Sequence, residues 1–169
     1  AAKNLWGISA NKSMLAICSY WPSGKIDLQF RTTNESLRIA EESGDIYSKV
    51  ISYVNHGVSC LGKGLLEEAE KHLLKGIEFC ERINWTFWNG NAQFYLGETY
   101  FEMGDFSKSK EQYEKGSWGW ESNRLVPSWA NLAKVGSARS KVMNKEKDVN
   151  LESLYTHSRN NKIKVCEGW

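Results

Sequence analysis

The sequence predicts an all-α protein, a right-handed α-solenoid (superhelix) of about four antiparallel helix-turn-helix hairpins. The first observation is that Gly24, Gly64 and Gly104 recur at a strict spacing of forty residues. The second is that residues 46–85 and 86–125 superimpose at this spacing, and a self-match with a period of about 20–50 residues is typical of stacked repeats. The third is that apolar side chains recur at steps of three and four residues within each period, as on one face of a helix.

The chain is interpreted as a single repeat domain over residues 1–169. Its approximate units are 4–45, 46–85, 86–125 and 126–160, and residues 161–169 are interpreted as the start of a further repeat. The chain is expected to be an excised piece of a longer protein. Because terminal repeats need a polar outer face, its last apolar residues are expected to fold back or to mediate end-to-end self-association.

The helix boundaries follow from glycine and proline. The expected helices of units two and three cover 47–62, 66–83, about 86–103 and about 106–122. The second helix of unit four is expected later than the repeat register places it, at about 150–160. Glycine interrupts each pair because it tolerates the left-handed conformation of a helix C-cap. Pro22 ends the first helix of unit one, and Pro127 lies in the opening turn of the first helix of unit four, where a missing N–H costs little.

Small residues recur where the two helices of a hairpin are expected to approach each other. They form the pairs Gly57 and Gly97, Ala69 and Ser109, and Gly76 and Gly116. Gly90 is expected to lie outside this contact. Unit one departs from the pattern, because Ile17 and Gln29 stand where small residues are expected.

The stretch Leu96-Gly97-x-x-Tyr100-x-x-x-Gly104-Asp105-Phe106 resembles the tetratricopeptide repeat family. The usual period of that family is about 34 residues, so a period of forty resembles its long-repeat members, in which each helix is lengthened. The resemblance implies stacked helical hairpins and noncatalytic binding of a protein or peptide in a concave groove.

The resemblance also implies which residues line this groove, namely those at the groove positions of the first helix in each unit. The projected residues are Val54, Asn55, Val58, Asn91, Phe94, Tyr95, Glu98, Phe101, Glu102, Asn131, Lys134 and Lys141. Their apolar, acidic and basic character suits an amphipathic helix or an extended peptide that carries both signs of charge. It does not suit a clamp for a C-terminal carboxylate.

Two alternatives to a free-standing scaffold remain open. The first is an internal regulatory or spacer module of a larger multidomain signalling protein, such as a nucleotide cyclase or a transcription regulator. The second is a small-molecule sensor built on the eight Trp, seven Tyr and six Phe residues. We interpret these aromatic side chains mainly as filling between lengthened helices, since aromatic residues dominate core burial.

Composition argues against several other classes. The 22 basic and 20 acidic residues are interleaved, so we expect neither nucleic-acid nor membrane partners. The widely spaced cysteines are read as reduced apolar residues, from which we expect a cytoplasmic location. His56, His72 and His157 stand alone in the sequence, and we predict no catalytic, cofactor or metal site.

Overall fold

The computed structural model describes residues 4–121, 127–147, 149–150, 152 and 156. Within these residues the chain forms seven α-helices, one short π-helix and no strand, which confirms the all-α prediction. The elements are α1 (Leu5–Leu15), the π-helix η1 (Ala16–Tyr20), α2 (Ile26–Ser43), α3 (Ile46–Gly62), α4 (Leu66–Arg82), α5 (Thr86–Glu102), α6 (Phe106–Glu121) and α7 (Pro127–Met143).

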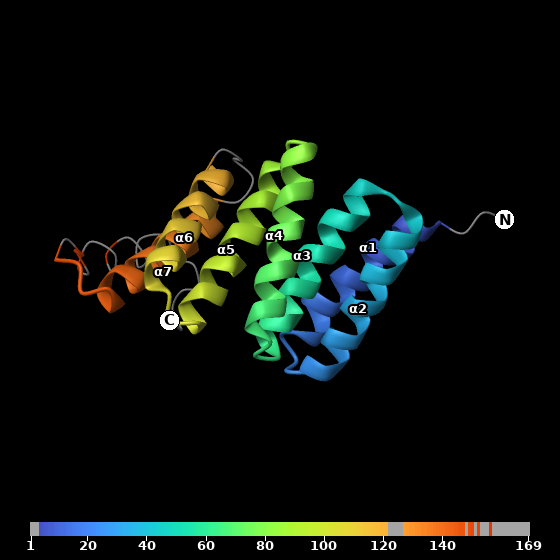
Figure 1. Ribbon diagram of the computed structural model, residues 1–169, viewed down its shortest axis with the longest axis horizontal. Coiled ribbons are helices and arrows are strands. Elements are labelled where there is room, and N and C mark those ends of the chain that lie inside the picture. Colours follow the sequence, from blue (N-terminus) through green and yellow to red (C-terminus); the bar gives the residue numbers. More distant parts are fainter. Residues whose placement is uncertain (1–3, 122–126, 148, 151, 153–155, 157–169) are drawn as a thin grey trace.

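The helices stack in chain order along the long axis of the molecule (Figure 1). Each helix packs on the one before it, and α1, α3, α5 and α7 also contact one another in succession. These four helices therefore form one layer, against which α2, α4 and α6 pack as a second layer. This arrangement confirms the predicted stacking of helical hairpins.

The observed helix pairs α1–α2, α3–α4 and α5–α6 lie inside the first three proposed units. The bounds of α3 to α6 agree with the predicted ones to within one residue. Helix α7 begins at Pro127, as expected. Most of the helix predicted over 150–160, and the whole of 161–169, lie outside the described residues.

A left-handed residue stands between consecutive helices every twenty residues. The positions are Gly24, Gly44, Gly64, Asn84 and Gly104, with φ between 52° and 80°. Glycine adopts this conformation without steric cost, and asparagine tolerates it better than most residues. The period of forty residues is thus two equal steps of twenty, one for each helix of a hairpin.

Close helix contacts explain why small residues recur at the same positions of the repeat. A Cβ atom added at Gly57 would lie 2.7 Å from Leu73 Cγ, and one added at Gly97 would lie 2.9 Å from the Tyr113 ring. The expectation for Gly90 is wrong, because its Cβ would lie 3.2 Å from the carbonyl oxygen of Gly116. Gly90 precedes Gly97 by seven residues, or about two helical turns, so both face α6.

Unit one shows what happens when the small residue is missing. Ile17 occupies the repeat position of Gly57, and it lies within the π-helix η1. π-helical turns occur mostly as single insertions in α-helices. The irregular helix therefore coincides with the departure from the repeat pattern.

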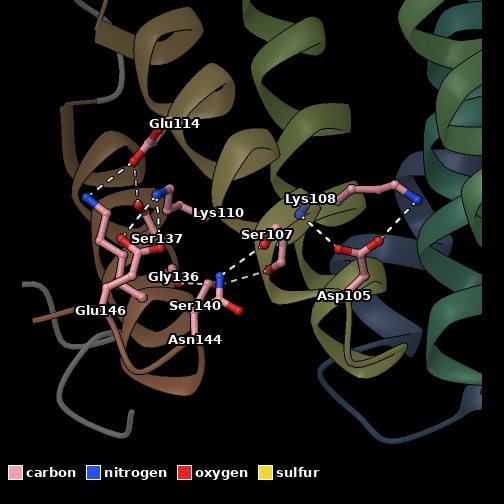
Figure 2. A network of polar contacts seen from close by, with 12 residues as sticks. Asp105, Ser107, Lys108, Lys110, Glu114, Gly136, Ser137, Ser140, Asn144 and Glu146 are labelled. Atoms are coloured by element: carbon pink, nitrogen blue, oxygen red, sulfur yellow. Dashed lines mark hydrogen bonds and ion pairs between the residues drawn. The ribbon is translucent and has the colours of Figure 1, made fainter.

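Polar contacts join α7 to α6 (Figure 2). Lys110 Nζ pairs with Glu146 Oε1 at 3.0 Å, and Asn144 donates a hydrogen bond to Ser107 Oγ at 3.3 Å. Ser137 Oγ donates to Glu114 at 3.1 Å. The first two contacts hold the turn after α7 against the start of α6, and the third joins the two helices near their middles.

Among the described residues, no helix is both long and apolar enough to cross a membrane.

Candidate peptide-binding site

A surface cleft of about 590 Å³ opens between the C-terminal end of α4, the start of α5 and the second half of α6. Its lining residues are Cys80, Glu81, Asn84, Trp85, Thr86, Asn89, Gln93, Glu111, Glu114, Lys115, Trp118 and Gly119. The cleft is therefore bounded by two helices of the second layer, α4 and α6, by the turn between α4 and α5 and by the first half of α5.

The local sequence explains how the cleft is built. The left-handed Asn84 ends α4 and turns the chain, so that Trp85 stands directly before α5. On the opposite side, a Cβ atom at Gly119 would lie 3.1 Å from Gly90 Cα. The N-terminal half of α5 and the C-terminal half of α6 thus approach closely, and the wide Trp118 side chain is left on the surface.

Two tryptophans form the apolar walls of the cleft. Trp118 is 68% exposed, the largest exposed fraction among the described large apolar residues. Trp85 is partly buried and is held by Tyr47 and Trp88, whose ring centroids lie 5.4 and 5.9 Å from its own. A large exposed tryptophan beside a hollow is typical of a contact surface, because tryptophan is enriched at interfaces.

The charged lining of the cleft is mainly acidic. Glu81, Glu111 and Glu114 stand against one basic residue, Lys115, which pairs with Glu111 at 2.7 Å. Gln93 is only 7% exposed, and its side-chain carbonyl oxygen has no hydrogen-bond partner. That oxygen is enclosed by the protein. The excess of acidic side chains on the lining favours a ligand that brings positive charge.

Five of the projected groove residues are buried: Val54, Asn55, Val58, Asn91 and Phe94, all 8% exposed or less. Helix α3 is enclosed by α1, α2, α4 and α5, and a Cβ atom at Gly76 would lie 2.7 Å from Val54 Cγ2. The family's groove position in α3 therefore faces the second helix of its own hairpin. These five side chains are not available to contact a partner in this structure.

The remaining projected residues are partly or fully exposed, but they do not form one strip. Tyr95, Glu98, Phe101 and Glu102 lie on α5, and Asn131, Lys134 and Lys141 lie on α7. Lys134 pairs with Glu121, and Lys141 Nζ lies 3.3 Å from Glu114 Oε1. Both lysines therefore face α6, not α5.

Sequence reasoning missed Arg139, which organises the contact between α5 and α7. Its guanidinium pairs with Glu98 Oε2 at 2.9 Å and lies 3.8 Å from the centroid of the Phe101 ring. Tyr113 donates a hydrogen bond to Glu98. Burial and the Glu98 carboxylate raise the pKa of the Tyr113 phenol. Glu98 is thus held by internal partners.

The aromatic residues divide between the two interpretations. Trp88, Phe94 and Trp120 are buried and fill the space between helices. Trp6, Tyr47, Trp118 and Trp129 are exposed. The sequence showed which residues are aromatic, but the exposure of Trp118 depends on how α6 packs against its neighbours.

Comparison with known proteins supports the repeat assignment. The model of the tetratricopeptide repeat family matches residues 91–116, which cover most of α5 and the first part of α6. A search of curated proteins finds no match to this chain.

Proposed function

We propose that this chain, which carries a tetratricopeptide repeat, is a noncatalytic scaffold that binds a protein or peptide partner in the cleft between α4 and α6. Repeats of this family generally mediate protein–protein interaction. The observation that carries the choice of surface is the cleft of about 590 Å³ beside the exposed Trp118.

The chemistry of the cleft favours a partner segment with a Lys or Arg side chain flanked by apolar residues. The cation would lie against the face of Trp118 or Trp85, a contact worth about 0.5–2 kcal/mol depending on desolvation. Glu81 and Glu111 supply opposite charge at the rim. The apolar neighbours of the cation would cover the rest of the tryptophan surface.

Three of the projected groove residues form a second contact surface in this proposal. Tyr95, Phe101 and Glu102 lie on α5, in the layer of first helices, and each retains exposed surface. Arg139 covers one face of the Phe101 ring. We therefore expect this surface to contribute less to partner binding than the cleft.

The alternative is an internal regulatory or spacer module of a larger signalling protein. In that case the partner segment belongs to another domain of the parent chain, and the same cleft would hold it. Binding of a separate peptide shows that the cleft has affinity for such a segment, but not where the natural segment comes from. Peptides from the rest of the parent chain must therefore be included among the probes.

The test is selection of a random peptide library displayed on phage against the immobilised chain, followed by fluorescence anisotropy with the selected peptides. We expect enrichment of peptides with a basic residue among apolar ones. Replacement Trp118→Ala should weaken binding at least about tenfold, equivalent to roughly 1.4 kcal/mol. Glu111→Gln should weaken it less and reduce its salt dependence.

The matched control is Trp6→Ala, since Trp6 is 48% exposed on α1, away from the cleft. It should leave binding unchanged, and Phe101→Ala tests the second surface separately. Selected peptides that bind equally well to the Trp118→Ala variant and to the original chain would exclude the cleft. Failure to enrich any peptide would count against the scaffold function itself.

A further inference from the structure

Outside the cleft, three metal-ligating side chains meet inside the second hairpin. His56 and Cys60 lie one turn apart on α3, and His72 faces them from α4. One ring nitrogen of each histidine and the Cys60 sulfur all lie within 4.8 Å of one another. The two imidazole rings are 4.7 Å apart between centroids. Sequence reasoning treated both histidines as isolated.

The hydrogen bonds around His56 assign its free nitrogen. Thr33 Oγ1 lies 3.0 Å from His56 Nδ1 and within donating distance of the Phe30 carbonyl, at 3.1 Å, and of Ser59 Oγ, at 2.8 Å. A hydroxyl has one proton to donate. With that proton given to either of these acceptors, Thr33 accepts from Nδ1–H of His56, and His56 Nε2 keeps its lone pair.

The surroundings of His72 favour Nδ1 as its ligand atom. Its Nε2 lies 3.8 Å from Glu68 Oε2. Its Nδ1 is buried without a hydrogen-bond partner. A carboxylate beside the outer nitrogen of a histidine is a common second partner of metal-bound imidazole, because it orients the ring and raises its basicity. The orphaned Nδ1 is then the nitrogen with a lone pair to offer.

We propose that His56, Cys60 and His72 bind a divalent transition-metal ion, with Zn²⁺ as the best match to two imidazole nitrogens and one thiolate. Zinc takes such ligands in tetrahedral geometry, at about 2.0–2.1 Å to nitrogen and about 2.3 Å to sulfur. The fourth position is left for water. Thr33 and Glu68 act as the outer partners of the two histidines.

The distances require a small contraction on binding. Ligand atoms in a tetrahedral zinc site lie about 3.3–3.6 Å apart, as follows from the bond lengths. In this structure the three ligand atoms lie within 4.8 Å of one another. Side-chain rotations that move these atoms by roughly 1 Å bring them to the spacing of a zinc site. Cys60 loses its thiol proton to solvent when the Zn–S bond forms, because the thiolate is the ligand.

One of the three ligands reaches the surface, and the charge of the bound site is balanced. The His72 side chain is 17% exposed and lines a surface hollow together with Tyr53, Glu67 and Lys71. Zn²⁺ with one thiolate and two neutral imidazoles carries a net charge of +1, and the Glu68 carboxylate lies beside it. The bound ion would tie α3 to α4 independently of the cleft, which lies beyond the other end of α4.

The experiment is titration of the purified chain with Co²⁺, followed by displacement with Zn²⁺. His157→Gln and Cys166→Ala are introduced first, so that these two residues outside the described part of the chain cannot supply ligands. We expect one Co²⁺ per chain, the intense visible absorption of a tetrahedral site and a thiolate-to-cobalt charge-transfer band. Displacement by Zn²⁺ should abolish the visible absorption and the charge-transfer band, and it should raise Tm.

Cys60→Ser and His72→Gln should each remove the charge-transfer band or weaken binding more than tenfold. Thr33→Val should weaken it about 10–100-fold, as replacement of an outer partner does. The matched control Cys80→Ala removes an equally buried thiol of α4 and should leave the spectrum unchanged. Circular dichroism checks that each variant is folded.

Two results would overturn the proposal. One is the absence of tetrahedral cobalt absorption in the folded chain. The other is equal affinity in the parent and in the His72→Gln variant, which would show that the metal binds at other surface groups. Because His72 is partly exposed, the His72→Gln variant should fold, so that its metal affinity can be measured even if Cys60→Ser does not fold.

Discussion

The junction of α1, α2 and α3 and the junction of α5, α6 and α7 fill equivalent places in the repeat with opposite kinds of side chain. At the first, Ser9, Ser13, Ser36 and Ser52 are fully buried. Ser36 Oγ lies 2.8 Å from Ser13 Oγ and 2.9 Å from Ser52 Oγ, and it donates to the Ser9 carbonyl at 2.8 Å. Three helices therefore meet at one network of hydroxyl groups.

The second junction is packed with large rings. Phe94 lies 5.6 Å from Tyr113 and 5.5 Å from Trp120, and Trp120 lies 5.4 Å from Trp129, all between ring centroids. Small hydroxyl groups fill the first junction, whereas rings fill the second, although Gly90, Gly116 and Gly119 still bring α5 close to α6. The rings of Phe94, Tyr113 and Trp120 are almost fully enclosed, whereas Trp118 on the same helix as Trp120 faces the cleft.

The largest effect on stability is expected from removing a ring of the aromatic junction. Trp120 is 1% exposed, so Trp120→Ala should lower the free energy of unfolding by about 3–5 kcal/mol, through lost burial and the cavity left behind. Urea denaturation followed by circular dichroism measures this. Trp118→Ala, on the same helix, should cost less than about 1 kcal/mol; equal losses would show that the rings do not hold this junction.

An acid-dependent effect of intermediate size is expected beside the serine junction, in chelator-treated protein. Burial, with a smaller contribution from His72, lowers the pKa of His56 from 6.5 to about 4. Between these two values the unfolded chain binds a proton that the folded chain does not. Stability should therefore be complete above pH 6.5 and fall by about 3 kcal/mol as the pH drops to about 4.

His56→Gln should remove most of that pH dependence, although it also removes the contact with Thr33. Part of the slope should remain, because burial lowers the pKa of His72 as well, against the opposing effect of Glu68. Denaturant midpoints measured at several pH values provide the test. An unchanged slope in the variant would mean that His56 is not kept neutral by the fold.

The smallest of these effects is expected from the serine junction itself. Ser36→Ala removes one hydroxyl and leaves its neighbours short of partners, at a cost of about 1–2 kcal/mol. The exposed Ser19 provides the control, since Ser19→Ala should change stability by less than about 0.5 kcal/mol. Equal midpoints for both variants would mean that the buried hydroxyls contribute no more than surface ones.

The sequence by itself determined the helices and their stacking order. Helix periodicity, Pro127 and the recurring glycines act within a few residues, so their effects can be read locally. The match of residues 91–116 to the tetratricopeptide repeat family agrees with that local pattern. Even so, Asn84 was missed as a turn residue, because the forty-residue period concealed the twenty-residue step.

Only the tertiary structure decided which side chains are available to a partner. Val54 and Phe94 have groove positions by repeat register, yet close approach at Gly76 and Gly116 buries them. The spacing of His56 and Cys60 was visible, but their meeting with His72 requires α3 and α4 to fold against each other. Periodicity specifies a face of a helix, whereas the distance to the neighbouring helix decides what that face contacts.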